Sequence, residues 1–239
     1  MRRNILHGIY RVFETWSQTI QPACSKGCSS CCTRNVNITA LEGEEILDYI
    51  LATHQEEWMA KILADQQSVS HPVQTTNDFA HACLKESKTK TEPAPDLSPC
   101  PFLEANCCRI YPVRPFSCRL FLSTAVCSAS QPADLPNHYI EAATATSQLI
   151  EHLGQKEYWG NMLDVLPALL DISTYSSIGK KVGALPTRQA HLRLLTAKPL
   201  PGFLISEEAG PEVSALLETI FSTEVHGISI EDFLNGQRE

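Results

Sequence analysis

The sequence predicts a mainly α fold in which an irregular, cysteine-rich core with short extended pieces packs on helices. Apolar residues recur every three or four positions along most of the chain, as they do on the buried face of a helix. Strand-like alternation is rare and short. Eight of the ten cysteines lie instead in two short runs whose prolines, glycine and serines do not favour regular structure.

Length and composition narrow the class of protein. The chain has 239 residues, of which 43% are hydrophobic, and this length can bury a core without disulfides. Its net charge of -8 argues against nucleic acid or an anionic membrane as the main partner. The N-terminal residues lack the unbroken apolar region of a signal peptide, and no stretch reaches the roughly 20 apolar residues of a membrane span. We therefore expect a cytoplasmic protein, in which clustered thiols more often hold metal than form disulfides.

Helical patterns dominate the part of the chain before the second cysteine run. Residues 4–20 predict an amphipathic helix that leads into the first run, and residues 35–39 predict a short extended piece. Thr39 and Glu42 then have the spacing of a capping box, which opens the next helix. A further helical pattern follows through Trp58, Ile62 and Leu63, and a weaker one covers residues 77–86.

Residues 87–99 are rich in proline and should form an exposed connection that leads to the second cysteine run. We predict a cysteine-cluster metal-binding domain over residues 1–134 and a helical region over residues 135–239 that packs on it. In the second region, a helix from residue 137 should end at Gly154, and Ser229 should cap a short last helix. Further helical periods cover the segments 158–172, 187–197 and 211–222.

The two cysteine runs suggest a shared metal site. Thiolates are the strongest soft ligands in proteins, and closely spaced cysteines in turns can chelate one ion. Gly27 can adopt the positive φ that folds the first run around an ion. Because neighbouring side chains point apart in extended backbone, Cys31 and Cys32 should serve different ions, or only one of them should ligate. The runs contain these cysteines: Cys24, Cys28, Cys31 and Cys32 in the first, and Cys100, Cys107, Cys108 and Cys118 in the second.

As a set, these motifs resemble the YkgJ-type cysteine-cluster family, which is described as chelating zinc or iron. The resemblance covers about residues 20–128 and rests on three segments, CSKGCSSCC from residue 24, CPFL from residue 100 and CRIYPVRPFSCR from residue 108. It implies a metal centre, with Tyr111, Arg114, Pro115 and Arg119 as the other motif residues. Flagellin lysine methylases look like relatives, although this sequence lacks a glycine-rich nucleotide loop. By this match, the metal ligands are Cys24, Cys28, Cys31, Cys32, Cys100, Cys108 and Cys118.

The number of thiolates leaves the metal open. Two zinc ions with one bridging thiolate would use all seven, whereas one [4Fe-4S] cluster would use four. Buried thiolates also need nearby cations. In the match Cys107 is an extra neighbour of Cys108, and we predict that Cys107 and Cys83 are not essential ligands and that Cys127 is a buried thiol. Five cations stand beside the cysteines in the sequence: Lys26, Arg34, Arg109, Arg114 and Arg119.

Three other interpretations of the cysteines are weaker. The spacing of Cys24, Cys28 and Cys31 also matches radical S-adenosylmethionine enzymes, but these need repeated βα units that the chain does not indicate. A disulfide framework needs an oxidising compartment. A hydrolytic zinc site usually uses histidine or carboxylate ligands, and neither run contains a histidine.

We therefore expect a metal-binding protein with a structural, regulatory or protein-interaction role. Its partners would be a zinc or iron ion and, in the last of these roles, another protein. A metal-dependent enzyme is the alternative, either a protein lysine methylase or an iron-sulfur oxidoreductase. Spare thiolates beside arginines would also suit a redox or sensing role, because they oxidise readily.

Overall fold

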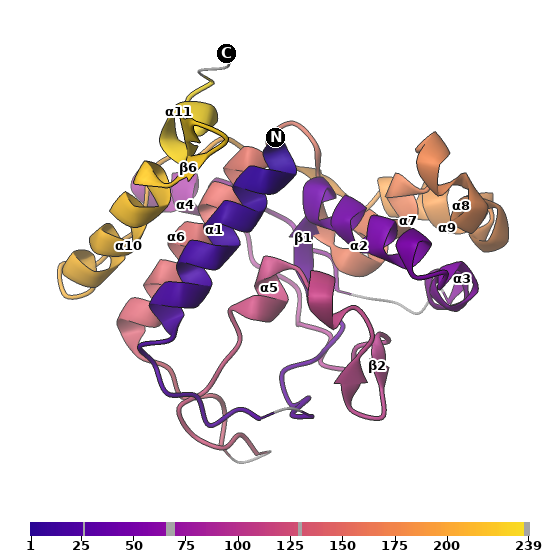
Figure 1. Cartoon of the computed structure of the whole chain (residues 1–239), viewed down its shortest axis with the longest axis horizontal. Helices are drawn as coiled ribbons and strands as arrows, with labels where there is room; N and C mark the ends of the chain where they lie inside the picture. Colours follow the sequence, from indigo (N-terminus) through magenta and orange to yellow (C-terminus); the bar gives the residue numbers. More distant parts are fainter. Residues whose placement is uncertain (26, 66–69, 129–130, 237–239) are drawn as a thin grey trace.

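The computed structural model describes residues 1–25, 27–65, 70–128 and 131–236, and it is mainly helical (Figure 1). The longest strand, β4, has four residues. The helices are α1 (Arg2–Ser17), α2 (Ala40–Ala52), α3 (Glu56–Ala64), α4 (Thr76–Leu84), η1 (Tyr111–Val113), α5 (Phe116–Arg119), α6 (Asn137–Leu153), α7 (Met162–Leu169), η2 (Ser173–Tyr175), α8 (Ser176–Val182), α9 (Ala184–His191), α10 (Gly210–Ser222) and α11 (Ile230–Leu234). The strands are β1 (Asn37–Thr39), β2 (Leu103–Glu104), β3 (Cys107–Cys108), β4 (Tyr158–Asn161), β5 (Leu195–Thr196), β6 (Glu224–Val225) and β7 (Ile228–Ser229).

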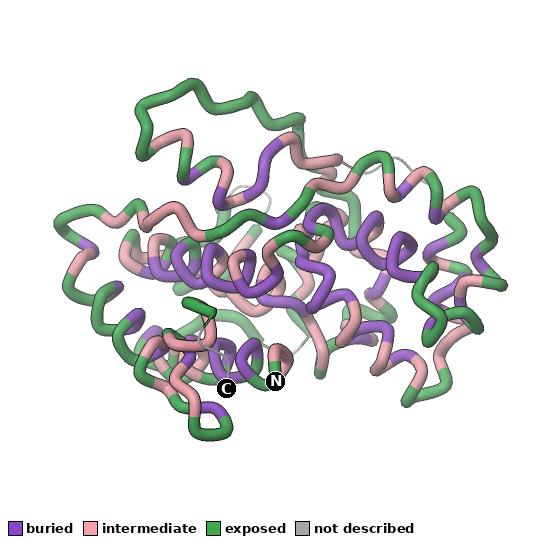
Figure 2. The backbone as a smooth tube through the Cα atoms, turned by 90° about the horizontal axis from the view of Figure 1, so that it is seen from above, coloured by how far each residue is buried: buried purple, intermediate pink, exposed green. Residues whose placement is uncertain are grey.

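The apolar side chains form two clusters. In the first, α1 packs against α6 and α10 through buried residues such as Phe13, Leu149 and Ile220. In the second, α2 packs against α7, and α3 packs against α8, around residues such as Ile46 and Leu166. Figure 2 shows that the buried residues follow the central helices, whereas much of the connecting chain is exposed. These clusters hold the helices together without any cysteine at their centres.

A small antiparallel sheet, in the order β1-β4-β5, links the segment after the first cysteine run to the second half of the chain. Ile38 of β1 lies opposite Gly160 of β4, and Trp159 of β4 lies opposite Leu195 of β5. Met162 N also donates to Val36 O at 2.7 Å. The chain that leaves the first cysteine run is therefore fixed to the second half by backbone hydrogen bonds.

Most of the expected helices and caps are confirmed. Helices α1, α6 and α10 occupy the predicted segments, and Ser229 caps α11 by accepting a hydrogen bond from Asp232 N. The helical prediction is wrong at two places. Residues 158–161 form β4 and residues 195–196 form β5, because pairing within the sheet overrides the local helical pattern. The division at residues 134 and 135 stays a prediction, and residues from both predicted regions share both apolar clusters.

One buried carboxylate connects three helices. Glu42 is 4% exposed and forms the predicted capping box at the start of α2, where its Oε2 accepts from Thr39 N at 2.9 Å and from Thr39 Oγ1 at 3.0 Å. Its Oε1 accepts from the Tyr10 hydroxyl of α1 and from Phe116 N, at the start of α5, both at 2.8 Å. Cys118 lies two residues beyond Phe116, so this carboxylate also fixes a predicted metal ligand.

None of the helices in the described part of the chain combines the length and hydropathy that a membrane crossing requires.

Replacing Glu42 should destabilise the protein strongly. Glu42→Ala leaves buried donors of Tyr10, Thr39 and Phe116 without their acceptor, so we expect a loss of about 2 kcal/mol or more in the free energy of unfolding. Glu42→Gln should lose less, because one side-chain oxygen remains. Denaturant unfolding measures both changes. Glu218→Ala on the exposed face of α10 is the control, with an expected change within about 0.5 kcal/mol. A Glu42→Ala variant as stable as this control would contradict the role of Glu42.

Candidate metal centre

The first cysteine run is folded by consecutive turns. Cys28 N donates to Ser25 O at 3.0 Å, and Cys32 N donates to Ser29 O at 2.9 Å. Gly27 has φ +91°, the positive value predicted for it, which residues with a Cβ rarely adopt. These turns replace the extended backbone that we expected at Cys31 and Cys32. As a result, the two neighbouring thiols lie close enough for each to affect the pKa of the other.

The backbone brings the two runs together. Thr33 and Pro99 form an isolated antiparallel bridge. On either side of it, Cys100 N donates to Cys32 O at 3.0 Å and Arg34 N donates to Ser98 O at 2.9 Å. Cys32 and Cys100 are therefore neighbours, although 67 positions of the sequence separate them. In Figure 1 the segment after α1 and the β2 hairpin lie at the same end of the molecule.

A tight hairpin orients the two neighbouring cysteines of the second run. Strands β2 and β3 are joined by Ala105 and Asn106, which both have positive φ. Because side chains alternate along a strand, Cys107 and Cys108 face opposite sides. Cys107 lies opposite Glu104 and is exposed, whereas Cys108 lies opposite Leu103 and is half-buried. Cys108 packs against the second apolar cluster, as do Cys100 and Cys118, so the geometry favours Cys108 as the ligand.

The two runs line one cavity of about 680 Å³. All seven predicted ligands line this cavity, and so does Cys107. Each cysteine of the chain is a free thiol, and Cys83 on α4 does not line this cavity. Within the described residues, no three Cys, His, Asp or Glu side chains are already arranged to hold one ion. The thiols that line the cavity are those of Cys24, Cys28, Cys31, Cys32, Cys100, Cys107, Cys108 and Cys118.

Burial makes the thiols of Cys100, Cys108 and Cys118 hard to ionise without a cation. It raises the pKa of the Cys100 thiol to about 11 and also raises the pKa of Cys108 and Cys118. The neighbouring Cys100 and Cys108 raise the pKa of Cys118 further. The neighbouring Cys31 thiol lowers the pKa of Cys32. Several thiols that oppose one another's ionisation are a donor set that zinc or iron fits, because the metal charge stabilises the thiolates together.

Backbone groups prepare two of these sulfurs for ionisation. Hydrogen bonds from the backbone of Phe102 and Ile110 lower the pKa of Cys100 and Cys108, respectively, against the effect of burial. Each donor residue follows its cysteine by two positions. Donors of this kind hold a thiolate in place and support metal ligands from outside the coordination sphere.

Of the four cations beside the cysteines that the structure describes, two act on the thiols. Lys26 lies outside the described residues. Arg119 contacts residues of α1 instead. Its Nη1 donates to Glu14 Oε1 at 2.5 Å, and its guanidinium lies 4.6 Å from the centre of the Tyr10 ring. Arg109 pairs with Glu104 at 3.0 Å and lies over the ring of Trp58. By contrast, Arg34 lowers the pKa of Cys100 and Arg114 lowers that of Cys108.

Arg114 is directed toward the cavity by its packing. Its guanidinium lies 3.9 Å from the centre of the exposed Tyr111 ring, and both residues line the cavity. Its Nε is buried and, within the described chain, has no hydrogen-bond partner. A donor left unpaired beside several sulfurs can compensate a thiolate charge.

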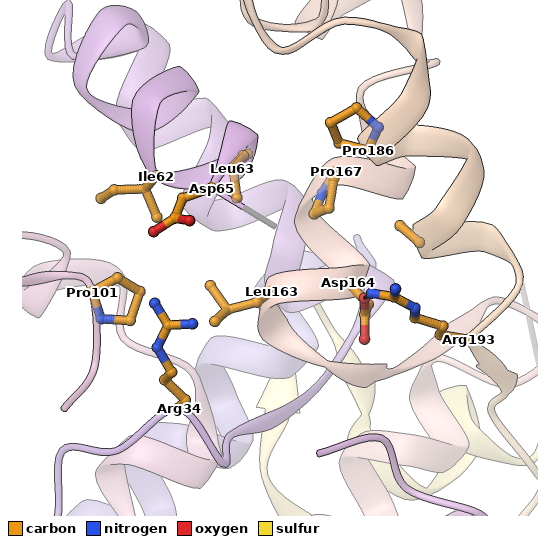
Figure 3. A pocket seen from close by; sticks show the side chains of 11 residues that line it. Arg34, Ile62, Leu63, Asp65, Pro101, Leu163, Asp164, Pro167, Pro186 and Arg193 are labelled. Atoms are coloured by element: carbon orange, nitrogen blue, oxygen red, sulfur yellow. Dashed lines mark hydrogen bonds and ion pairs between the residues drawn. The ribbon is translucent and has the colours of Figure 1, made fainter. Parts of the chain in front are cut away.

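A second cavity, drawn in Figure 3, is lined in part by Arg34 and has no thiol in its lining. It measures only about 30 Å³, enough for about one water molecule. Asp164 at its wall is 3% exposed and bonds His71 Nδ1 at 2.7 Å. His71 is thus used in an ion pair away from the cysteine cavity.

Comparison with known proteins places this site in a family. Residues 23–146 match the CxxCxxCC family model, whose description reads "Putative zinc- or iron-chelating domain". No curated protein and no solved structure matches the chain. The match spans slightly more than half of the 239 residues and contains every cysteine that lines the cavity. The chain therefore belongs to the CxxCxxCC family of zinc- or iron-chelating domains.

Proposed function

We propose that the protein binds zinc or iron through the thiolates of the two cysteine runs, with a structural, regulatory or protein-interaction role. The observation that carries this proposal is the convergence of eight thiols from two distant segments on one cavity. The seven cysteines proposed as ligands are Cys24, Cys28, Cys31, Cys32, Cys100, Cys108 and Cys118.

The chemistry of the cavity supports this proposal. A bound metal would supply the positive charge that lets buried, mutually repelling thiols ionise, and each ligand would release its proton on binding. Arg34 and Arg114 would compensate part of the negative charge that remains. As part of the proposal, the protein works in the reducing cytoplasm, because the exposed thiols of Cys24, Cys28 and Cys31 would oxidise elsewhere.

An enzyme is the second candidate, either a protein lysine methylase or an iron-sulfur oxidoreductase. The volume of the cavity supports an enzyme, since about 680 Å³ is far more than one ion needs and falls within the range of small-molecule sites. Tyr111 and Phe121, both lining the cavity and 60% and 46% exposed, would contact such a ligand.

Metal content and colour test the proposal and separate the two classes. Anaerobically purified protein should contain at least about one zinc or iron ion per chain by elemental analysis. Colourless protein with zinc supports the metal-binding module, and brown protein with visible Fe-S absorbance supports the iron-sulfur enzyme. A folded chain that takes up neither metal, even after reconstitution under reducing conditions, would exclude both.

Replacing the two neighbouring cysteines of β3 tests which one is a ligand. Cys108→Ser should lower the metal content strongly, because the half-buried Cys108 lies with Cys100 and Cys118. The exposed Cys107 should tolerate the same change. Cys83→Ser on α4 is the matched control for loss of a thiol outside the cavity. Metal loss in Cys107→Ser with retention in Cys108→Ser would reverse the assignment.

Removing the metal should loosen the cysteine segments and leave the helical packing in place. Residues 24–36 and 87–118 contain little regular structure, so their order should depend on ligation. Helices α1, α6 and α10 share an apolar cluster that contains no cysteine. Limited proteolysis with a strong chelator and a reductant should therefore cut first in these two segments, while circular dichroism shows little loss of helix. An unchanged digestion pattern after verified metal loss would refute this expectation.

A further inference from the structure

A third cavity, which we call the α5 cavity, has a volume of about 200 Å³ and lies beside the helix that carries Cys118. Among the described residues, it shares only Phe121 with the cysteine cavity, and no cysteine lines it. A cavity of about 150 Å³ can hold benzene, so this one can hold a small organic molecule. Its lining comes from β1, β4 and the helices α2, α4, α5 and α6 with the chain next to them: Asn35, Asn37, Ile38, Thr39, Glu42, Thr76, Phe116, Ser117, Leu120, Phe121, Ser147, Ile150 and Trp159.

The charge around the α5 cavity is negative. Glu42 is the only charged residue among the described residues that line it. Every hydrogen bond that its carboxylate accepts within the described chain comes from a neutral group. Arg119 lies over the Tyr10 ring, but its ion pair is with Glu14. Because the field of a buried charge is screened weakly, a carboxylate without a paired cation makes this cavity attractive to positive charge.

Several polar groups of the α5 cavity can only accept hydrogen bonds. Asn37 Oδ1 is buried and has no hydrogen-bond partner in the described chain. Ser117 and Ser147 donate their hydroxyl protons to the backbone, to Asn37 O at 2.6 Å and to Ala143 O at 2.9 Å. Each of these hydroxyls therefore has lone pairs, but no proton, left for a ligand. An unpaired buried acceptor costs free energy, which a ligand with an N–H donor would recover.

The remaining walls are mostly apolar and partly aromatic. Trp159 and Phe116 are buried, and aromatic faces attract cations as well as apolar groups. Asn35 and Trp159 bring N–H donors to the lining, but these donors carry no charge. Because Asn35 and Phe121 are exposed, a ligand can reach the α5 cavity from solvent.

We propose that the α5 cavity binds a small organic ammonium compound, with its charged nitrogen toward Asn37 Oδ1 and Glu42 and its apolar part against Trp159. Such a ligand supplies the positive charge that the lining lacks and the N–H donor that Asn37 lacks. The site is distinct from the proposed metal centre, and ligand binding there does not require a bound metal.

Three matched probes of the full-length protein test the chemical class of the ligand. At pH 7 benzylamine is positively charged, benzyl alcohol is neutral and benzoate is negatively charged, and each is close to benzene in size. Ligand-observed NMR titrations measure the Kd of each probe. Benzylamine should bind at least about 10 times more tightly than either of the others, because only its ammonium group brings a positive charge to Glu42.

Two substitutions locate the bound benzylamine. Asn37→Leu keeps the approximate shape of the side chain but removes the unpaired oxygen, and Ser147→Leu fills the cavity from α6. Each should raise the Kd at least about 10-fold. Thr144→Leu is the matched control, because Thr144 lies exposed on the same helix and its hydroxyl also donates to the carbonyl four positions earlier, Ile140 O, at 2.8 Å. This control should bind benzylamine as the wild type does, and circular dichroism checks that each variant is folded.

The outcomes decide this inference separately from the proposed function. Absence of saturable benzylamine binding to the wild type would overturn it, and so would equal or tighter binding of benzyl alcohol or benzoate. An unchanged Kd in either folded variant would place the amine elsewhere and overturn it as well. If one variant does not fold, the other variant and the comparison of the three probes still decide. Metal content tests only the proposed function, because the α5 cavity contains no cysteine.

Discussion

The buried carboxylate of Glu42 is the constraint on which the arrangement of the metal site depends most. It receives hydrogen bonds from Tyr10 of α1, from Thr39 at the start of α2 and from Phe116 at the start of α5. A buried charge is tolerated only where such donors surround it, so these three helices cannot shift independently. Because α5 carries Cys118, the position of one predicted ligand is set by a group that is not itself a ligand.

Backbone hydrogen bonds connect the two cysteine runs. Cys100 N donates to Cys32 O, and Ala23 N, in the residue before Cys24, donates to Ser123 O. Because these segments contain little regular structure, the free energy of metal binding would contribute directly to their order. The helices owe their packing to the apolar clusters, so the helical part of the fold does not depend on ligation by the cysteines.

The sequence predicted those features that depend only on residues close to one another along the chain. The capping box of Thr39 and Glu42 and the positive φ of Gly27 depend on neighbours within a few positions, and both are observed. The strand pairing of Trp159 could not be predicted, because short strands are specified by partners far away in the sequence. For the same reason, the backbone pairing of Ala23 with Ser123 leaves no local pattern in the sequence.

The placement of charge differs across the cavity. Arg34 lowers the pKa of Cys100 and Arg114 lowers that of Cys108, and both thiols are half-buried, where water screens charge less and a nearby cation therefore counts most. The thiols of Cys24, Cys28 and Cys31 are exposed, so water can screen their negative charge without an arginine. A set of thiolates that spans this cavity would therefore be stabilised by arginine at its buried end and by water at its exposed end.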